Sequence, residues 1–251
     1  MAELIVATIE QGVAQAGTLT AYRKPLVAFA PADDPQFAAL RHLAEPTHML
    51  PEDLCPGARS VVSFFLPFDV SVVQANAAHR SRVAREWAVA YVETNALIGC
   101  ITARLIALLG EWGVRAGAEP ATGNFDPETL ISRWSHKSVA VVAGLGSFGL
   151  HHMVITDAGC AGRFGSLVVA ADLPPSPRVV KERCLYFYDG SCRACVDQCP
   201  IGALDVDGGI DKQRCWQRCL VFAEQFKALG VAEICGKCAI GPCALASTVE
   251  E

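Results

Sequence analysis

The sequence predicts an α/β domain over residues 1–177 followed by a cysteine-rich domain over residues 178–251. Three observations indicate this division. Strand-like and helix-like segments alternate in the first part, three prolines fall within residues 174–177, and nine of the twelve cysteines follow those prolines. A proline-rich stretch is stiff and extended, as connectors between domains often are.

The first part contains one long helical pattern among several short apolar runs. Apolar residues recur at helical spacing over residues 81–113, which predicts a long amphipathic helix ended by Gly110 and Gly113. Short apolar runs rich in β-branched and aromatic residues predict buried strands. These runs are residues 26–30, 61–66, 139–143, 153–156 and 166–170. Strands interleaved with a long helix favour a layered α/β arrangement.

Composition and charge exclude several classes of protein. Apolar residues make up 52% of the chain, enough for a buried core, and the formal net charge of −5 gives no general attraction to phosphate backbones. Glu3 stands where a signal peptide needs basic residues, and no uninterrupted apolar stretch is long enough to span a bilayer. We therefore expect a protein of the reducing cytoplasm with no membrane partner, in which clustered cysteines bind metal rather than form disulfides.

The spacing of the nine late cysteines indicates iron–sulfur clusters. They follow the pattern Cys184, Cys192-x2-Cys195-x3-Cys199-Pro200, Cys215, Cys219, Cys235-x2-Cys238-x4-Cys243. Thiolates at such spacings hold [4Fe–4S] clusters, with four ligands each, so eight of these cysteines suffice for two. Two alternatives remain open: one cluster with spare thiols, or a four-thiolate zinc site built from two Cys-x2-Cys pairs.

One position of the cluster motif is missing. The usual two-cluster ferredoxin motif begins with a cysteine three residues before Cys192, and Asp189 stands there instead. Cys184 lies five residues earlier, and a loop could carry it back into that place. Metal clusters would also replace the hydrophobic core that this short domain lacks.

Residues near a glycine-rich turn are candidates for a second site. The pattern Gly144-x-Gly146-x-x-Gly149 follows a predicted strand, but the next residues run toward another strand, which disfavours a dinucleotide fingerprint. Close backbone approach to a large flat cofactor and a tight turn without ligand are the competing interpretations. Each nearby histidine is either a metal ligand or proton donor, or a structural residue. These are His136, His151 and His152, of which His152 is the first to test.

Three further residues have both a functional and a structural interpretation. Asp126 is a candidate general acid with Glu128, but Asp126-Pro127 is also a typical helix start. Arg163 is a candidate contact for a carboxylate or phosphate. Cys160, in a glycine-rich loop, either borders a site or is structural.

Several stretches resemble the epoxyqueuosine reductase family of iron–sulfur proteins. They are residues 54–62 (LCPGARSVV), 143–149 (AGLGSFG), 162–166 (GRFGS) and the cysteine motifs, with Cys215 following Lys-Gln-Arg. The resemblance implies a nitroreductase-like α/β domain fused to a two-cluster ferredoxin-like domain. It also implies cobalamin held between the two, with electrons supplied through the clusters.

The resemblance also implies site residues. The first cluster would be held by Cys184, Cys192, Cys195 and Cys243, and the second by Cys199, Cys215, Cys235 and Cys238. Cys219 is then spare, or replaces Cys184 or Cys215. The implied cofactor contacts are Gly144, Gly146, Gly149, Arg163 and Gly165, and His152 and Asp126 are the candidate catalytic residues.

The chain departs from the family in two places. The family's catalytic aspartate lies in an Asp-Ser-x-Pro segment, whereas residues 119–128 read EPATGNFDPE, so Asp126 is only a possible replacement. The tRNA-binding helical extension is not expected, and residues 181–251 carry eight basic and ten acidic residues, so tRNA is an unlikely partner. We expect an oxidoreductase with a flavodoxin- or ferredoxin-type donor and a small-molecule or protein-bound substrate. The alternative is an electron-transfer protein that reactivates a partner corrinoid protein.

Overall fold

A four-stranded antiparallel sheet forms the centre of the chain. The computed structural model describes residues 1–43, 46–178, 181–207 and 209–249. The strands lie in the order β1-β2-β6-β3, which joins segments far apart in the sequence. Their bounds are β1 Leu26–Pro31, β2 Ser60–Pro67, β6 Gly162–Val169 and β3 Ala116–Gly117.

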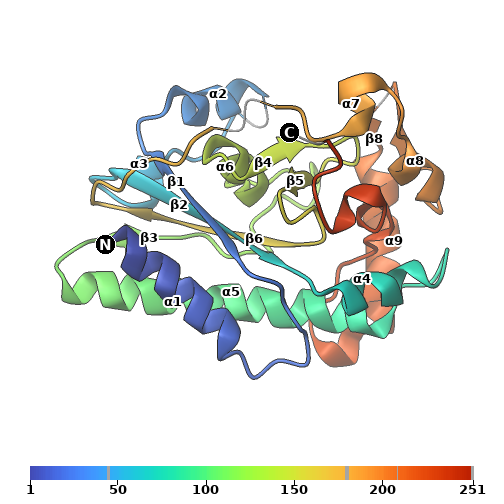
Figure 1. Ribbon diagram of the computed structural model, residues 1–251, viewed down its shortest axis with the longest axis horizontal. Helices are drawn as coiled ribbons and strands as arrows, with labels where there is room; N and C mark the ends of the chain where they lie inside the picture. The colour runs from blue at the N-terminus through green and yellow to red at the C-terminus, as the bar shows by residue number, and fades with distance from the viewer. Residues whose placement is uncertain (44–45, 179–180, 208, 250–251) are drawn as a thin grey trace.

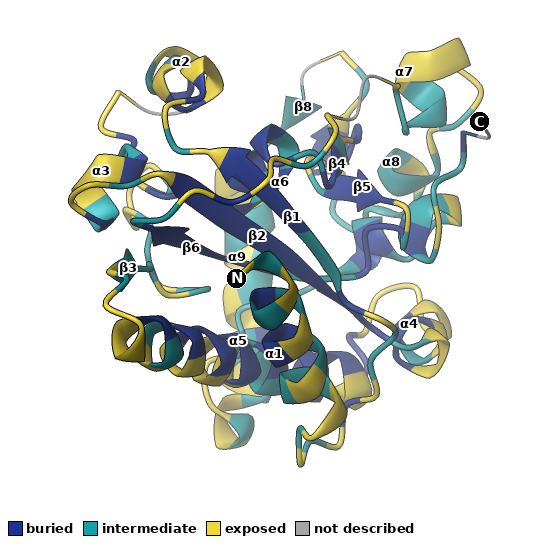
Figure 2. Ribbon diagram, turned by 60° about the vertical axis from the view of Figure 1, so that its left-hand side comes forward, coloured by how far each residue is buried: buried dark blue, intermediate teal, exposed yellow. Residues whose placement is uncertain are grey.

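Helices cover both faces of this sheet (Figure 1). On one face lie α1 (Ala2–Ala14) and α5 (Arg85–Glu111), and on the other lie α2 (Pro35–Leu43) and α6 (His136–Val142). Successive side chains of a strand point to opposite faces, so Phe164 and Val168 of β6 pack with α6, whereas Leu167 and Val169 pack with α5. Because both faces are covered, the strands are buried along most of their length (Figure 2).

Helix α5 is long and apolar enough to pass a length and hydropathy test for a membrane-spanning helix. Its buried side chains, including Leu97, Ile101 and Leu105, lie in the same core cluster as residues of α1 and the sheet. That packing is typical of the core helix of a globular protein.

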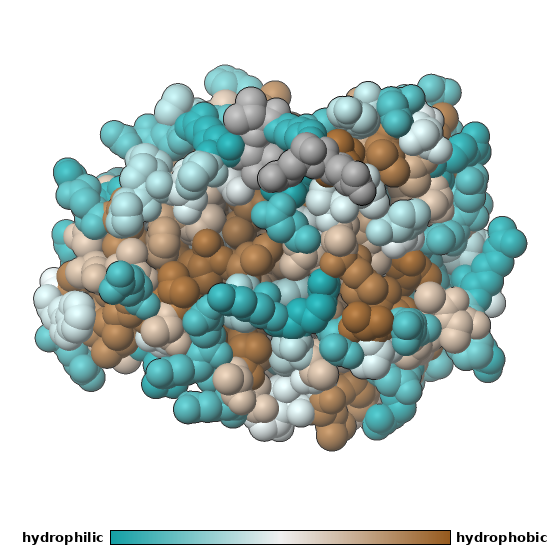
Figure 3. Space-filling view, viewed as in Figure 1, coloured by the Kyte–Doolittle hydropathy of each residue, from teal (hydrophilic) through white to brown (hydrophobic). Residues whose placement is uncertain are grey.

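On the face shown in Figure 3, the described hydrophobic residues form patches separated by hydrophilic ones.

The mixed α/β character predicted from the sequence is confirmed, with one wrong element. The predicted strand at residues 139–143 lies in helix α6, which Ser135 caps by accepting a hydrogen bond from the backbone of Ser138. A short apolar run fits a buried helix as well as a buried strand, so periodicity could not separate the two. Helix α6 leads into a hairpin of β4 (Gly146–Phe148) and β5 (Val154–Thr156).

The remaining elements are short. Before α5 lie α3 (Pro51–Leu54) and α4 (Val70–Ala77). The cysteine-rich part contains few regular residues besides one helix. Its elements are α7 Leu185–Asp189, α8 Ala194–Gln198, β7 Leu204–Asp205, β8 Gly209–Ile210, α9 Lys212–Gln225, η1 Lys227–Leu229, η2 Lys237–Ala239 and η3 Pro242–Ala244.

The cysteine-rich part shares a core with the first part. Trp87 of α5 and Ile155 of β5 lie in one cluster of buried residues with Phe222 and Ile234. We call this contact between the first part and the cysteine-rich part the seam. The guanidinium of Arg23 donates to backbone carbonyls on both sides of it, those of Phe68, Ala158 and Leu245. The boundary between residues 177 and 178 stays a prediction, and Val179 and Val180 lie outside the described residues.

Candidate functional site

Five cysteines line one small pocket beside the β4–β5 hairpin. Four of them, Cys184, Cys192, Cys195 and Cys243, are the set predicted for the first cluster, and the fifth is Cys238, which was predicted for the second. Apolar side chains, among them Leu150 and Ile155, make up much of the remaining lining. The cavity therefore combines thiols with a water-poor surround, as a cluster site requires.

The chain brings Cys184 to this cavity through a short helix rather than a loop. Cys184 is the N-cap of α7, and Gly190 ends that helix in the left-handed conformation (φ 77°). The reversal at Gly190 brings Cys192 to the same cavity as Cys184. Cys184 thus occupies the neighbourhood in which the missing first cysteine of the motif is needed.

Thiols crowd one another in this first group. Burial, and after it the neighbouring sulfurs of Cys243, Cys184 and Cys192, together raise the pKa of Cys195 to about 12. A bound cation removes this penalty because it stabilises the thiolate form. The four side chains thus suit a metal group better than they suit free thiols.

A second group of thiols adjoins the first. Cys215 and Cys219 lie four residues apart on α9 and so share a face, and the thiol of Cys219 donates to Cys215, which lowers the pKa of Cys215. Burial raises the pKa of Cys238, and so do the nearby sulfurs of Cys235, Cys215, Cys195 and Cys199, in that order. The structure therefore brings the four cysteines predicted for the second cluster together and adds Cys219 to them.

Donors and cations surround this second group. The backbone N–H of Ala203 donates to Sγ of Cys199 at 3.2 Å, and Nε of Arg218 donates to Sγ of Cys235 at 3.0 Å. Lys137 of α6 also lowers the pKa of Cys215 by its charge. Such donors stabilise thiolate sulfur, the form that ligates metal.

The geometry does not favour a single four-thiolate zinc site. Such a site would need the pairs Cys192/Cys195 and Cys235/Cys238 to face one ion. Instead the first pair shares its pocket with Cys184 and Cys243 as well as with Cys238, while Cys235 lies near Cys219 and Cys238 in the second group. The division into two groups of thiols agrees with two metal groups, although the ligand assignment stays a prediction.

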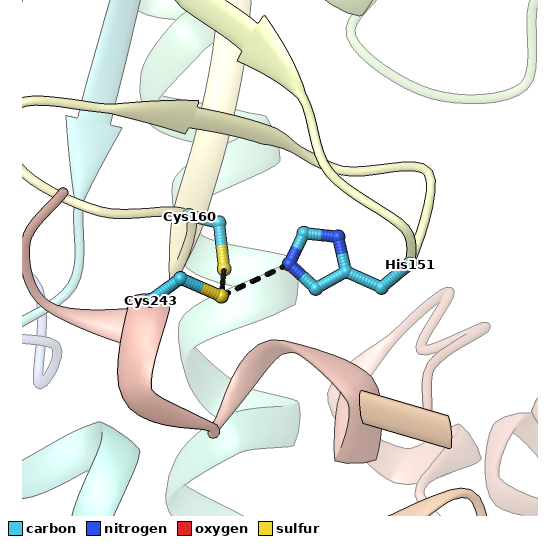
Figure 4. A group of neighbouring side chains, drawn as sticks. All are labelled: His151, Cys160 and Cys243. Carbon is cyan, nitrogen blue, oxygen red and sulfur yellow. Dashed lines mark hydrogen bonds between the residues drawn. The ribbon is translucent and has the colours of Figure 1, made fainter. Parts of the chain in front are cut away.

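Two buried side chains approach Cys243 from the first part of the chain (Figure 4). Nε2 of His151 lies 3.2 Å from Sγ of Cys243, and Sγ of Cys160 lies 3.9 Å from it. His151 is 3% exposed and Cys160 is fully buried. The thiol of Cys160 and then the ring of His151 lower the pKa of Cys243. The sequence offered nothing to separate His151 from its neighbour His152, so its contact with a cysteine was not predicted.

His152 has a different environment. It is exposed, its backbone lies in the left-handed region (φ 59°), and Nζ of Lys137 donates to its carbonyl oxygen at 2.9 Å. Burial of part of the ring and then the charge of Lys137 lower the pKa of His152. A catalytic role for His152 stays a prediction.

Asp126 is an exposed residue of a turn. Its Oδ1 accepts hydrogen bonds from the backbone N–H groups of Glu128 and Thr129, and these bonds lower the pKa of Asp126. A general acid at neutral pH needs a shift in the opposite direction. In this conformation Asp126 therefore stabilises a turn. The helix start that Asp126-Pro127 predicted is wrong, because the chain forms no helix directly after this turn.

The structure does not bring the predicted cofactor contacts together. Arg163 and Gly165 lie on the α5 face of β6, where Arg163 stacks on Tyr91 and a Cβ at Gly165 would overlap the ring of Phe64. Gly144 ends α6 on the other face, and a Cβ there would overlap the carbonyl oxygen of Pro177.

The other two glycines of the turn also pack on the chain itself. A Cβ at Gly146 would overlap the backbone of Ile155, and one at Gly149 would crowd the side chains of Ile155 and His151. Close packing of the chain thus accounts for these glycines, and their contact with a cofactor stays a prediction. The turn follows a helix and precedes a strand, so it lacks the strand–turn–helix context of a dinucleotide site.

Comparison with known proteins connects this arrangement with one family. The epoxyqueuosine reductase of Lactococcus garvieae (strain Lg2) is 30% identical over 101 residues, which is 39% of this chain and 27% of that protein. The chain resembles the epoxyqueuosine reductases. This confirms the resemblance expected from the sequence. No protein-family model matches the chain.

Solved epoxyqueuosine reductases have the same fold over nearly the whole chain. The Bacillus subtilis enzyme, in a structure with its catalytic loop swung out of the active site, matches with a TM-score of 0.60 at 18% identity, over 96% of this chain and 66% of that one. The Streptococcus thermophilus enzyme matches with a TM-score of 0.58 at 15% identity, over 97% and 68%. The chain thus spans about two thirds of the solved epoxyqueuosine reductases.

Two further structures extend the comparison. An epoxyqueuosine reductase with an epoxyqueuosine-modified tRNA stem loop matches with a TM-score of 0.60 at 17% identity, over 96% of this chain and 66% of that one. A catabolic reductive dehalogenase matches with a TM-score of 0.53 at 15% identity, over 89% and 30%. Because the first of these two structures contains a tRNA stem loop, the expectation that tRNA is an unlikely partner finds no support in this comparison.

Proposed function

We propose that this chain is an iron–sulfur reductase of the epoxyqueuosine reductase type that holds two [4Fe–4S] clusters. The observation that carries the proposal is the pocket shared by five thiols from three separate segments of the chain, four of which are the predicted ligands of the first cluster. The proposed ligands of the first cluster are Cys184, Cys192, Cys195 and Cys243, and those of the second are Cys199, Cys215, Cys235 and Cys238. When bound, the two clusters would pass electrons one at a time between an external donor and an acceptor.

The residues present fit such groups. The first pocket is largely apolar and is lined by the four thiols that one cluster needs, with Cys238 of the second group beside them. At the second group, hydrogen bonds from Ala203 and Arg218 stabilise sulfur, and Lys137 adds positive charge. These contacts orient the thiols and favour their ionised form, which is the form that binds a metal.

We propose that electrons enter at α7. Cys184 caps this helix, and Phe187 and Tyr188 of the same helix are more than half exposed. Exposed aromatic side chains over a buried redox site suit the transient docking of a flavodoxin- or ferredoxin-type donor. The second group, beside α6 and α9, is then the exit toward an acceptor in the first part of the chain.

A corrinoid acceptor is implied by the family resemblance, but the residues predicted to hold it do not fit one cradle. Arg163 and Gly165 lie on one face of the sheet and the Gly144 turn lies on the other. We therefore assign no residue and no step to a corrinoid. We likewise assign no substrate, and tRNA and small molecules are the classes to test.

The same mismatch favours a second candidate function. If the chain holds no acceptor cofactor of its own, it would transfer electrons to a partner protein, such as a corrinoid protein that needs reactivation. Such a protein shows no turnover alone, and its clusters are reoxidised when the partner is added. An enzyme with its own substrate turns that substrate over without the partner, and adding the partner does not reoxidise its clusters.

Anaerobic purification with metal analysis tests the proposal. Two [4Fe–4S] clusters predict about eight iron atoms per chain and broad absorbance at ~400 nm that dithionite bleaches. A colourless protein carrying zinc or no metal would overturn it. Extraction of the same sample for corrinoid separates the enzyme from the electron-transfer alternative.

A further inference from the structure

We propose that His151 raises the reduction potential of the first cluster by donating an Nε2–H hydrogen bond to Cys243, with Cys160 as a second donor to the same sulfur. This inference rests on the proposed function, because it treats Cys243 as a cluster ligand. The heavy-atom distances are 3.2 Å from His151 and 3.9 Å from Cys160 (Figure 4). Both donors come from the first part of the chain, so the cluster potential depends on the seam between the two parts.

The direction of the hydrogen bond follows from the other ring nitrogen. Nδ1 of His151 lies 3.1 Å from the backbone nitrogen of Met153, which is a donor. Nδ1 must therefore accept, and a neutral ring that accepts at Nδ1 carries its proton at Nε2. That proton lies on the nitrogen next to Sγ of Cys243, so the ring donates to the sulfur.

The β4–β5 hairpin holds the ring in this position. The backbone N–H of Gly149 donates to the carbonyl of Met153, and the N–H of His152 donates to the carbonyl of Gly149. A Cβ at Gly149 would crowd the ring of His151, so glycine at this position leaves room for it. His151 thus belongs to a hydrogen-bonded turn and is fixed before any metal binds.

The same argument disfavours a mononuclear metal site. His151, Cys160 and Cys243 lie close enough to bind one ion, since their ligand atoms are all within 4.8 Å of one another. A histidine ligand offers a lone pair to the metal, whereas Nε2 here carries the proton. The group is therefore a hydrogen-bonded neighbour of the cluster ligand.

Cys160 completes the arrangement. The backbone N–H of Cys160 donates to the carbonyl of Cys243 at 3.0 Å, which keeps the two side chains adjacent. Sγ of Cys160 lies 3.9 Å from Sγ of Cys243, within reach of an S–H hydrogen bond to that sulfur. The S–H of Cys160 is the weaker of the two hydrogen-bond donors to Sγ of Cys243, because S–H is a poorer donor than N–H.

A donor to a ligating thiolate stabilises the reduced cluster more than the oxidised one, because reduction adds negative charge at the sulfurs. Loss of the His151 donor should therefore lower the potential. A tenfold weakening of the reduction equilibrium corresponds to 59 mV for one electron. We expect a shift of this order for one of the two clusters and none for the other.

Two substitutions separate the hydrogen bond from the fold of the hairpin. His151→Asn keeps an acceptor for the N–H of Met153 but is too short to reach Cys243. His151→Gln extends an amide donor to about the position of Nε2. His42, an exposed residue of α2, supplies the matched control His42→Asn.

The readout is a potentiometric titration of the reconstituted protein, followed by electron paramagnetic resonance, with iron content measured on each sample. We expect one midpoint potential to fall in His151→Asn, to return most of the way in His151→Gln, and to stay unchanged in His42→Asn. An unshifted potential in a fully iron-loaded His151→Asn variant overturns the inference and leaves the proposed function intact. A wild-type protein without iron overturns both.

Should His151→Asn fail to retain iron, Cys160→Ala decides. It removes the second donor without altering the hairpin, and we expect a smaller fall of the same midpoint potential. An unchanged potential in iron-loaded Cys160→Ala then overturns the role assigned to these donors.

Discussion

Gly236 lies directly against the indole ring of Trp87, so that a Cβ at residue 236 would overlap the ring. Gly236 stands between Cys235 and Cys238, and Trp87 is a buried residue of α5. The close approach therefore fixes a proposed cluster-binding loop against the longest helix of the first part. Gly236 also has a positive φ of 68°, which glycine adopts without strain.

The first prediction concerns this contact. Gly236→Ala should lower the free energy of unfolding by about 2–4 kcal/mol, because it adds an overlap with Trp87 to the cost of a positive φ. Gly190→Ala is the matched control, since Gly190 has a φ of 77° and nothing within 4 Å of its Cβ position. Chemical denaturation of both variants measures the difference. Equal losses would show that the indole ring does not limit residue 236.

The second prediction concerns the choice between Cys184 and Cys219. Because Cys184 lines the first cavity, Cys184→Ser should lower iron content by about half, the share of one of two [4Fe–4S] clusters. Cys219→Ser should leave most of the iron, because Cys215 remains beside it. Cys100→Ser, at an exposed position of α5, is the control. Full iron in Cys184→Ser together with loss in Cys219→Ser would reverse the assignment.

The third prediction concerns a buried lysine. Nζ of Lys237 donates to the carbonyl of Asn76, to Oδ1 of Asn76 at 2.9 Å and to the carbonyl of His79 at 2.7 Å. Lys237→Met removes this donor from all three oxygens, of which Oδ1 of Asn76 keeps a bond from the backbone N–H of Ala84, and should lower the free energy of unfolding by about 2–3 kcal/mol. Lys227→Met, which removes an exposed lysine, should change it by less than about 0.5 kcal/mol. Denaturant melts of the two variants provide the test.

The fourth prediction concerns His136, which is 8% exposed. Burial, assisted by the charge of Arg163, lowers the pKa of His136 from 6.5 to about 4, so the ring is neutral at pH 7. Nε2 then donates to the carbonyl of Pro120, and Nδ1 accepts from the hydroxyl of Ser166. A lowered pKa contributes stability above pH 6.5 that is lost as pH falls toward 4.

The loss from this ring should amount to about 2 kcal/mol between pH 7 and pH 5. His136→Gln removes the titrating ring, and its unfolding free energy should depend less on pH over this interval, whatever its value at pH 7. His42→Gln should retain the wild-type dependence. Parallel pH profiles for wild type and His136→Gln would contradict the assigned pKa.

Much of the fold was predictable from local pattern. Predicted strands at residues 26–30, 61–66, 153–156 and 166–170 overlap β1, β2, β5 and β6, and the predicted helix contains α5. Residues 139–143 were wrong because a short run of buried valines satisfies a helix and a strand alike. The alternation along β6 was not visible in advance, and it separates Arg163 and Gly165 from the Gly144 turn.

The sequence by itself determined the number and the spacing of the thiols, because both are read directly from the chain and are the same in any arrangement of it. Tertiary structure alone decided which thiols share a cavity and which side chains reach them. Cys184 joins Cys243 across 59 positions, and His151 rather than His152 meets its sulfur. Such contacts depend on how the hairpin, α7 and the last cysteines pack at the seam, and no single segment of sequence contains that information.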